Sequence, residues 1–271
     1  MADIRITKLH PSLGAEVAGV DLNAPADDAT RAALARALGE HLVLVFRDQA
    51  FTPDGYLSAA SVFARPMRQH YSQHNMPDYP DIGVIEYEDG RRPADWHTDH
   101  TNRERPPMAT LLYGIAVPSR GGATSIANMR AAYDALPPAE QRRYESMRTI
   151  NSLDSDRPDT RAEDRAKYSA PITHPMVRTH PVHGSKAIYF HVTKTLNIEG
   201  MGADESRAML QGLIDRLITP EITYDHVWRR GDLIVIDNRA TMHRANHDYD
   251  PSEARLLWRI IVEGDRPVLT S

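Results

Sequence analysis

Residues 42–46 read Leu-Val-Leu-Val-Phe, and the polar sequence Arg-Asp-Gln follows at 47–49. A five-residue apolar run that polar residues close is too short for a typical helix and predicts a buried strand. Comparable apolar runs predict further core strands at 109–117, 233–236 and 256–262. We therefore expect a fold that is built around buried strands.

Shorter strands and several helices are expected around this core. Residues 4–22 alternate apolar and polar side chains and carry Gly14 and Gly19, which indicates short strands joined by tight turns. The strand at 124–127 follows a turn at Gly121 and Gly122 and should pair with the strand before that turn. Other strands are expected at 82–86 and 187–190, and helices at 27–40, 53–63 with Thr52 as cap, 129–136, 138–147 and 204–218. This pattern favours a β-sandwich or barrel buttressed by helices over a doubly wound parallel sheet.

The chain has 271 residues, of which 41% are hydrophobic and 25% charged, which suits one sizeable core. We expect a single domain over residues 1–271. Residues 66–107 are rich in His, Pro, Asp and Arg, which indicates long loops around a functional opening. Residues 151–171 are strongly charged and lack periodicity, which indicates a mobile lid or insertion, or equally a solvated surface loop.

The charge and the missing residue types narrow the classes of function. A formal net charge of -5 argues against nucleic acid and against an anionic membrane as partners. The chain has no cysteine, so imidazole and carboxylate groups must hold any metal ion. Neither a signal peptide nor a run of about twenty apolar residues is present in the sequence. We expect a cytoplasmic protein that binds a small soluble molecule.

The sequence Trp-His-Thr-Asp at 96–99 places the imidazole of His97 and the carboxylate of Asp99 two positions apart. On an extended segment both side chains point to the same face. A second imidazole, His243, follows the apolar strand at 233–236, and antiparallel strands can bring it to the same place. Two histidines and one carboxylate leave three positions of an octahedron open, as in non-haem iron(II) oxygenases. A His-x-Asp pair alone is weak evidence in a chain with 13 histidines.

Two arginines strengthen this hypothesis. Arg255 immediately precedes the apolar strand 256–262, and Arg259 lies within it. Because the two residues are four apart on an extended segment, their side chains share a face. An arginine inside a core is costly unless an anion meets it, and a guanidinium binds a carboxylate through two hydrogen bonds. Thr124 would add a hydroxyl donor to the same anion. In the alternative interpretation, both arginines face solvent or pair with Glu263, Asp265 or Asp248.

Together these motifs resemble the taurine dioxygenase and 2,4-dichlorophenoxyacetate dioxygenase family of 2-oxoglutarate-dependent enzymes. The resemblance runs over nearly the full length, and the order and spacing of the motifs carry it. The motifs are LGAEV at 13–17, GVDL at 19–22, VFRDQ at 45–49, WHTD at 96–99, GGAT at 121–124, MRAAYDALP at 129–137, HPMVRTHP at 174–181, DNR at 237–239, MHR at 242–244 and the closing arginine pair.

The resemblance implies a double-stranded β-helix, or jelly roll, with flanking helices. It implies a dioxygenase that uses iron(II), 2-oxoglutarate and O2. The iron ligands and catalytic centre would be His97, Asp99 and His243. Thr124 and Arg255 would bind the distal carboxylate of 2-oxoglutarate, and Arg259 would lie near the acidic group of the substrate.

The same resemblance points to a substrate region. His70, Tyr71 and His74 fall where related enzymes bind the substrate, although they could equally be loop surface, and His100, Asn102 and Arg103 could also face the substrate. His174 and His180 are expected to be structural. We expect a small anionic organic substrate and a homo-oligomer, either a dimer or a tetramer. Pro93 stands where the taurine enzyme has a substrate-binding asparagine, which counts against taurine itself.

Several alternatives stay open at this point. Hydroxylation of a C–H bond is the expected outcome, but desaturation, epoxidation or ring expansion can begin from the same chemistry. A non-catalytic jelly-roll protein could retain the metal site for its structure. A zinc hydrolase could use the same two histidines and carboxylate, although the arginine pair and Thr124 would then have no role.

Overall fold

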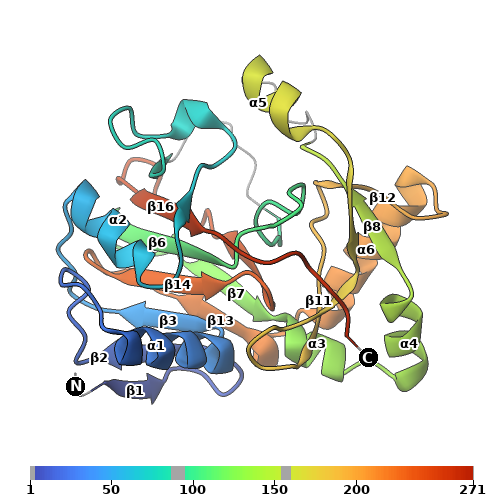
Figure 1. Cartoon of the computed structure of the whole chain (residues 1–271), viewed down its shortest axis with the longest axis horizontal. Helices are drawn as coiled ribbons and strands as arrows, with labels where there is room; N and C mark the ends of the chain where they lie inside the picture. Colours follow the sequence, from blue (N-terminus) through green and yellow to red (C-terminus); the bar gives the residue numbers. More distant parts are fainter. Residues whose placement is uncertain (1–3, 87–94, 154–159, 271) are drawn as a thin grey trace.

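The strand predicted at 42–46 lies inside an eight-stranded sheet of the computed structural model, which describes residues 4–86, 95–153 and 160–270 (Figure 1). Its strands are, in spatial order, β1 (Arg5–Lys8), β2 (Ala15–Ala18), β3 (Val43–Phe46), β14 (Leu233–Asp237), β6 (Ala109–Ala116), β16 (Leu256–Val262) and β4 (Pro66–Met67), and β5 (Gly83–Glu86) also pairs with β16. The pairing of β2 with β3 is parallel, and the other described pairings in this sheet are antiparallel. The protein is therefore mainly β, and a doubly wound parallel sheet is excluded.

Side chains of the large sheet alternate between two apolar clusters, one on each face. On β14, Ile234 packs into the inner cluster and Val235 into the opposite one. The helices α1 (Asp28–His41) and α2 (Pro53–Ser61) cover this second face and begin at the predicted acidic segment and at Thr52 (Figure 1). Burial stabilises such a side chain by about 1.5–3 kcal/mol. Burial on both faces explains why these strands are uninterrupted apolar runs in the sequence.

A smaller sheet packs against the inner face, with the order β13 (Thr223–His226), β7 (Thr124–Asn128) and β15 (Thr241–Ala245). Its Ile126 lies in the same cluster as Ile234. The prediction that 124–127 pairs with the strand before the turn is wrong, because β7 pairs with β13 and β15. Gly121 and Gly122 have φ angles of 71° and 64°, and a Cβ on Gly121 would lie 2.4 Å from the backbone oxygen of Asp248. These glycines form a corner between two sheets.

The remaining elements lie beside the two sheets, toward the C-terminus (Figure 1). They are α3 (Met129–Asp134), α4 (Pro138–Glu145), α6 (Ala203–Leu217), the 3-10 turn η2 (Pro220–Ile222), a sheet of β12 (Thr195–Ile198), β8 (Arg148–Asn151) and β9 (Ile172–Pro175), and the pair β10 (Val177–Thr179) and β11 (Lys186–Ile188). The three helices were predicted, whereas β8, β9, β12, β13 and β15 were not. Each of these five strands has four or five residues and includes polar side chains, so it shows no clear apolar run. No described helix has the length and apolar character that crossing a bilayer requires.

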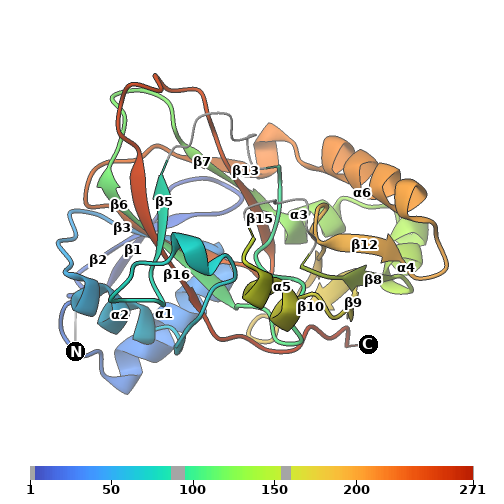
Figure 2. The ribbon, with the colours of Figure 1, turned by 90° about the horizontal axis from the view of Figure 1, so that it is seen from above.

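The segment expected to form loops around an opening, 66–107, and the segment expected to be a lid, an insertion or a surface loop, 151–171, are partly described. Within 66–107, residues 87–94 lie outside the described residues, and the 3-10 turn η1 (Ser72–His74) precedes β5. Within 151–171, residues 154–159 lie outside them, and helix α5 (Ala162–Tyr168) was not predicted. Helix α5 lies near the teal segment that carries η1 (Figure 2). The carboxylate of Asp164 on α5 accepts hydrogen bonds from the backbone N and the hydroxyl of Ser72, at 3.0 and 2.7 Å. Helix α5 is thus attached to the first segment, and its action as a lid stays a prediction.

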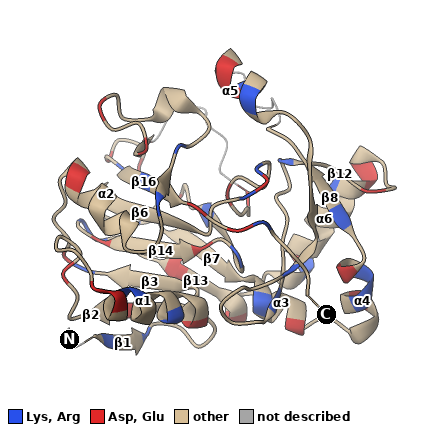
Figure 3. Cartoon of the chain, viewed as in Figure 1, with Lys and Arg blue, Asp and Glu red and all other residues tan. Residues whose placement is uncertain are grey.

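Charged side chains of both signs are interspersed along the chain (Figure 3). On the large sheet, Arg47 at the end of β3 lies 2.5 Å from Asp232 and 3.2 Å from Glu16. Asp232 also lies 3.2 Å from the buried ring of His226. Charges at the ends of the core strands are therefore paired with opposite charges, which offsets the cost of their partial burial.

Gly264 lies two residues after β16, and we expect Gly264→Ala to destabilise the fold. A Cβ atom there would lie 2.2 Å from the backbone oxygen of Pro106 and 2.5 Å from the backbone nitrogen of Met108. Because these neighbours are backbone atoms, the segment leading into β6 must move. The free energy of unfolding should fall by about 1–3 kcal/mol, which urea titration followed by circular dichroism measures.

Gly212→Ala is the matched control. Gly212 lies inside α6, where an added Cβ meets nothing within 4 Å. Because alanine is the better helix former, the free energy of unfolding of this variant should be about 0.5–1 kcal/mol higher than that of the parent protein. Equal stability of the two variants would contradict the packing described for Gly264.

Candidate active site

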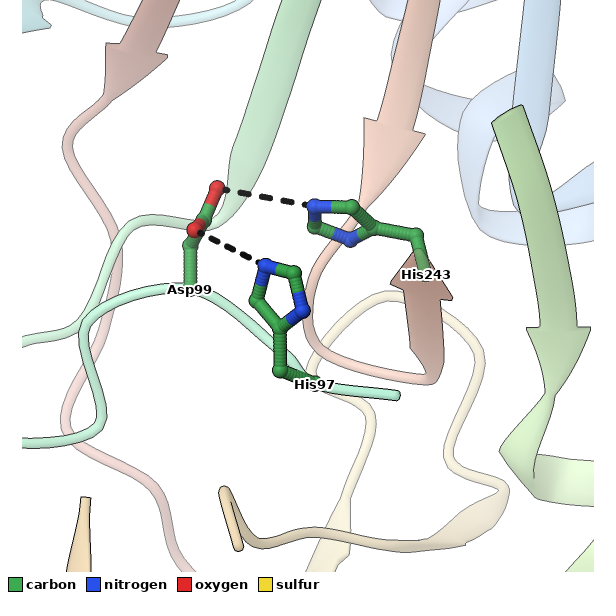
Figure 4. Close-up of side chains that lie close together, drawn as sticks. All are labelled: His97, Asp99 and His243. Carbon is green, nitrogen blue, oxygen red and sulfur yellow. Dashed lines mark ion pairs between the residues drawn. The ribbon is translucent and has the colours of Figure 1, made fainter. Parts of the chain in front are cut away.

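Two histidines and one aspartate meet where the segment after residue 95 crosses β15. The backbone N of His97 donates to the backbone O of His243 at 3.1 Å, and the N of His243 donates to the O of His97 at 2.7 Å. Asp99 lies two residues farther along the first segment. One nitrogen or oxygen atom from each of the three side chains lies within 4.8 Å of the other two (Figure 4). The structure thus brings together the three side chains named from the sequence, in an arrangement that can hold a metal ion.

Hydrogen bonds from two sides orient these groups. The hydroxyl of Thr110 on β6 donates to Oδ2 of Asp99 at 2.6 Å, and the side-chain amide of Asn238 donates to the oxygen of Thr110 at 2.8 Å. Nδ1 of His97 lies 2.7 Å from the backbone oxygen of Asp95. In the neutral ring this nitrogen therefore carries the proton, and Nε2 keeps its lone pair for a ligand bond. Nε2 of each of the two rings lies 3.9 Å from an oxygen of Asp99 (Figure 4).

The electrostatics of the group suit a cation. Burial raises the pKa of Asp99, but the guanidinium of Arg259, 3.9 Å away, and the neighbouring imidazoles outweigh burial and hold that pKa well below its usual range. Burial lowers the pKa of His243 to about 3, and the ring of His97 adds to this shift. At neutral pH Asp99 is therefore ionised and His243 is neutral. Metal binding requires these protonation states.

Arg255 precedes β16 and is buried, with 6% of its surface exposed. Its Nε donates to the backbone oxygen of Gly122 at 3.0 Å, and its guanidinium lies 5.9 Å from the ring centroid of Tyr249. Among the described residues, its Nη2 has no hydrogen-bond partner. Asp248 instead accepts a hydrogen bond from the backbone N of Gly122 at 2.8 Å. Arg255 therefore does not face solvent, and one buried donor remains for an anion.

Thr124 lies at the same corner of the fold. It is the first residue of β7 and is two residues after Gly122, which Arg255 contacts. The oxygen of Thr124 accepts a hydrogen bond from Nε1 of Trp228 at 3.0 Å, so its hydroxyl proton remains for another acceptor. The guanidinium of Arg255 thus contacts the same glycine corner that Thr124 follows by two residues.

Arg259 lies on the inner face of β16 and is fixed by Gln69. The Nε of Arg259 donates to Oε1 of Gln69, and Nε2 of Gln69 donates to the backbone oxygen of Arg259 at 2.9 Å. The same guanidinium faces Asp99 through Nη1. Arg259 thus connects the His-Asp-His group with the segment that carries His70. Because its charge is already close to Asp99, it does not need the acidic partners considered from the sequence.

His70 is fully buried and forms the centre of a polar cluster. Its ring centroid lies 4.4 Å from that of His100 and 4.0 Å from that of Tyr168 on α5. Nε2 of His70 accepts a hydrogen bond from Nε of Arg103 at 3.2 Å. The side-chain amide of Asn102 donates to the backbone oxygen of Tyr168 at 3.1 Å. The four residues named from the sequence around 70 and 100–103 are therefore in contact with one another or with Tyr168.

Tyr71 and His74 have different positions. Tyr71 has a left-handed backbone with φ of 59°, a sparsely populated conformation for a residue other than glycine. Its hydroxyl accepts a hydrogen bond from Nζ of Lys194, which lies 4.8 Å from the ring centroid. His74 is half-buried at the end of η1. The structure therefore places Tyr71 beside the cationic side chain of Lys194.

Sequence reasoning did not identify several residues of this region, which are Gln69, Thr110, His191, Lys194, Asn238 and Tyr168. His191 is buried, and its ring centroid lies 5.2 Å from that of His97. The contacts that reveal them join distant parts of the chain, and no local pattern marks such pairs. His174 and His180, expected to be structural, hydrogen-bond to the backbone oxygen of Arg103 at 2.8 Å and to the carboxylate of Asp237 at 3.0 Å.

Comparison with known proteins places this site in a family. Residues 5–261 match the model described as "Taurine catabolism dioxygenase TauD, TfdA family". The chain is 31% identical to pentalenolactone F synthase of Streptomyces avermitilis, over 97% of this chain and 95% of that protein. It is 32% identical to the alpha-ketoglutarate-dependent sulfate ester dioxygenase of Pseudomonas putida, over 96% of this chain and 90% of that protein.

Solved structures agree with this result. The crystal structure of AAD-2 in complex with Mn(II) and N-oxalylglycine superposes with a TM-score of 0.81 at 30% identity, covering 98% of this chain and 99% of that one. A dioxygenase that uses iron(II), 2-oxoglutarate and O2 is therefore supported over a zinc hydrolase or a non-catalytic protein. The chain belongs to the TauD and TfdA family of 2-oxoglutarate-dependent non-haem iron dioxygenases.

Proposed function

We propose that this enzyme hydroxylates a C–H bond of a small anionic organic molecule at an iron(II) ion held by His97, Asp99 and His243. The observation that carries this proposal is the convergence of the three side chains, whose ligand atoms lie within 4.8 Å of one another. Two imidazoles and one carboxylate satisfy three positions of an octahedral ion and leave three for other ligands. We also infer that the two facing sheets form the double-stranded β-helix that the family resemblance implies.

The metal and its co-substrate supply the oxidation: with O2 and a C–H bond, 2-oxoglutarate gives succinate and carbon dioxide, and one oxygen atom enters the substrate as a hydroxyl group. The chain supplies orientation. Thr110 and Asn238 hold one oxygen of Asp99 in place, and the backbone pairing of His97 with His243 sets the separation of the two rings. Fixing the ligands before the metal arrives avoids reorganisation when it binds.

Arg255 and Thr124 are the proposed partners of the distal carboxylate of 2-oxoglutarate. The buried Nη2 of Arg255 and the hydroxyl proton of Thr124 are two donors at one corner of the fold. Leaving a buried charged donor unpaired is costly, and a carboxylate would satisfy it. The chelating end of the same molecule would then reach the open positions of the metal.

Arg259 is the proposed partner of the acidic group of the substrate, with His70 and Tyr71 on the adjacent wall. The contacts between Arg259, Gln69 and the segment of His70 support this arrangement. One relative is named for sulfate esters. The guanidinium of Arg259 would be the cationic partner for an anionic group of that kind. His74 stays a predicted substrate residue, and Pro93, which argued against taurine, lies outside the described residues. Desaturation, epoxidation or ring expansion would begin from the same bound state.

The proposal is tested by measuring succinate that the purified protein forms from 2-oxoglutarate with added iron(II) and ascorbate. Sulfate esters, sulfonates and aryloxyacetates should be compared as substrates. We expect at least one of these anions to stimulate succinate formation and to yield a hydroxylated product by mass spectrometry. Asp99→Ala should abolish turnover, because only two protein ligands would remain. Normal turnover in a folded Asp99→Ala protein would remove the metal assignment.

A second prediction concerns the support of Asp99. Thr110→Val removes the 2.6 Å hydrogen bond to Oδ2 but keeps the shape of the side chain. We expect the affinity for Mn(II), measured by titration calorimetry, to fall about 10- to 100-fold, as for other residues that orient metal ligands. Thr149→Val removes a buried hydroxyl in β8, where it accepts a hydrogen bond from Asn151, and should leave metal affinity unchanged. Equal affinities of the two variants would contradict the role of Thr110.

A third prediction concerns Arg255. Arg255→Ala should raise the KM for 2-oxoglutarate about 10- to 100-fold, because a hydrogen bond between charged groups contributes about 1.5–3 kcal/mol. Steady-state succinate formation at varied 2-oxoglutarate concentration measures this change. The exposed Arg230 offers the matched control, since Arg230→Ala removes the same charge from the surface. An unchanged KM in a folded Arg255→Ala protein would exclude the proposed contact.

A further inference from the structure

The indole of Trp228 lies against the hydroxyl group of Thr124. Trp228 follows β13 by two residues, is buried with 6% of its surface exposed, and belongs to the inner apolar cluster. Its Nε1 donates a hydrogen bond to the oxygen of Thr124 at 3.0 Å, and both groups are buried. Trp228 is thus a direct neighbour of the hydroxyl that we assign to the distal carboxylate of 2-oxoglutarate.

This hydrogen bond determines what the hydroxyl of Thr124 can do. An indole N–H can only donate, so the oxygen of Thr124 is the acceptor. A threonine hydroxyl has one proton and two lone pairs, and the contact engages one of the lone pairs. The proton must point away from Nε1, since it would otherwise meet another donor. The hydroxyl of Thr124 therefore remains a donor whose direction is restricted.

Two neighbours from other parts of the chain hold the indole in place. At Gly114 of β6, an added Cβ would lie 3.2 Å from Cε3 of Trp228, so a larger residue there would displace the indole. The ring of His226 meets the indole edge to face, with centroids 4.6 Å apart and an interplanar angle of 86°. The turn that follows the indole hydrogen-bonds to the backbone of Gly114 through the N of Gly231 and the O of Asp232, at 2.9 Å each.

His226 is fixed in turn by polar groups at both of its ring nitrogens. The ring is fully buried. Its Nδ1 lies 3.2 Å from the hydroxyl of Tyr224, and its Nε2 lies 3.2 Å from the carboxylate of Asp232. Asp232 is itself paired with Arg47. Rotation of the His226 ring would break these contacts, so the wall against which Trp228 packs is rigid.

Thr124 is held at the other end of the hydrogen bond. It lies on β7, the central strand of the small sheet, where it faces His226 of β13 and Ala245 of β15. Arg255, the other proposed partner of the distal carboxylate, is bonded to the backbone oxygen of Gly122, two residues before Thr124. The fold therefore sets the positions of both the donor and the acceptor in the contact between the indole and the hydroxyl.

We propose that Trp228 positions the hydroxyl of Thr124 for 2-oxoglutarate: the indole N–H occupies one lone pair of the oxygen and leaves the hydroxyl proton to donate to the distal carboxylate. This inference rests on the proposed function, because it specifies how the co-substrate is held. Arg255 supplies the charge, and Thr124 supplies a hydrogen bond with a defined direction. Trp228 acts through Thr124 and is a positioning residue.

The first test observes the indole in the unmodified protein. The Zn(II)-loaded protein is labelled with 15N-tryptophan, and the indole resonances of its three tryptophans are assigned with Trp96→Phe, Trp228→Phe and Trp258→Phe. It is titrated with 2-oxoglutarate and with 2-oxopentanoate, which has the same chain length but no distal carboxylate. A hydroxyl that donates to a carboxylate becomes a stronger acceptor. The resonance of Trp228 should therefore move with 2-oxoglutarate and much less with 2-oxopentanoate.

The second test measures affinity by titration calorimetry with the Mn(II)-loaded protein. Trp228→Phe keeps an aromatic ring but removes the N–H, and it should raise the Kd for 2-oxoglutarate about 3- to 10-fold. The Kd for 2-oxopentanoate should not change, because this acid has no group for Thr124 to bind. Trp258→Phe is the matched control, since Trp258 packs against the apolar cluster on the opposite face of the large sheet. It should leave both Kd values unchanged.

A third measurement asks whether the two residues act together. Thr124→Val removes the hydroxyl and keeps the shape of the side chain. If Trp228 acts through that hydroxyl, Trp228→Phe should not raise the Kd for 2-oxoglutarate any further in the Thr124→Val protein. The same 3- to 10-fold rise in both backgrounds would show that Trp228 contributes through packing alone.

The outcomes separate this inference from the proposed function. An unchanged Kd for 2-oxoglutarate in Trp228→Phe, or an equal loss of affinity for both acids, overturns the role of Trp228. Equal movement of the Trp228 resonance with both acids also overturns it, and this readout does not require that Trp228→Phe fold, because the other two variants assign the spectrum by elimination. None of these measurements depends on turnover. Failure of the proposed function appears separately, as the absence of succinate from the unmodified iron-loaded enzyme.

Discussion

The active site depends on two backbone hydrogen bonds between His97 and His243, at 3.1 and 2.7 Å. Positions 97 and 243 are 146 apart in the sequence. Their antiparallel backbone pairing brings the two imidazole rings to the same metal-binding group. Backbone pairing fixes the separation of the two rings more firmly than side-chain contacts would, because each residue contributes both its donor and its acceptor. The third group, Asp99, follows from the alternation of side chains along the same extended segment.

Several charged or polar side chains around this pairing are buried. Asp99 is balanced by Arg259 and the imidazoles, so the group is ready for a cation. Arg255 and His70 each hold one buried nitrogen without a close partner in the described part of the chain. A buried polar group of this kind reduces stability, and a protein retains it when binding recovers the cost. The two nitrogens belong to different places in the fold, the corner at Gly122 and the segment around Arg103.

The structure also explains how distant segments stay in register around the site. The core strands alternate between two clusters, so a shift of one residue on β16 would move Arg259 from the inner face to the face covered by helices. Gln69 adds a second restraint, because it bonds both the guanidinium and the backbone of Arg259. Helix α5 is attached to the same wall through Asp164 and Tyr168, which couples the position of His70 to that segment.

The apolar runs, their polar ends and the helix caps were sufficient to predict the main strands, the principal helices and the mainly β class. The motifs were also sufficient to name the three groups that converge, because their residue types and order are specific to the family. Short polar strands such as β13 and β15 were missed, and β7 was assigned to the wrong partner. Local sequence does not encode whether two glycines form a hairpin or a corner, since that depends on Asp248, which fills the space beside Gly121. The sequence by itself determined which residues can carry the chemistry. The tertiary structure alone decided that Thr110 supports Asp99, that Gln69 fixes Arg259 and that Arg103 hydrogen-bonds to His70, because these contacts exist only once separate segments pack together.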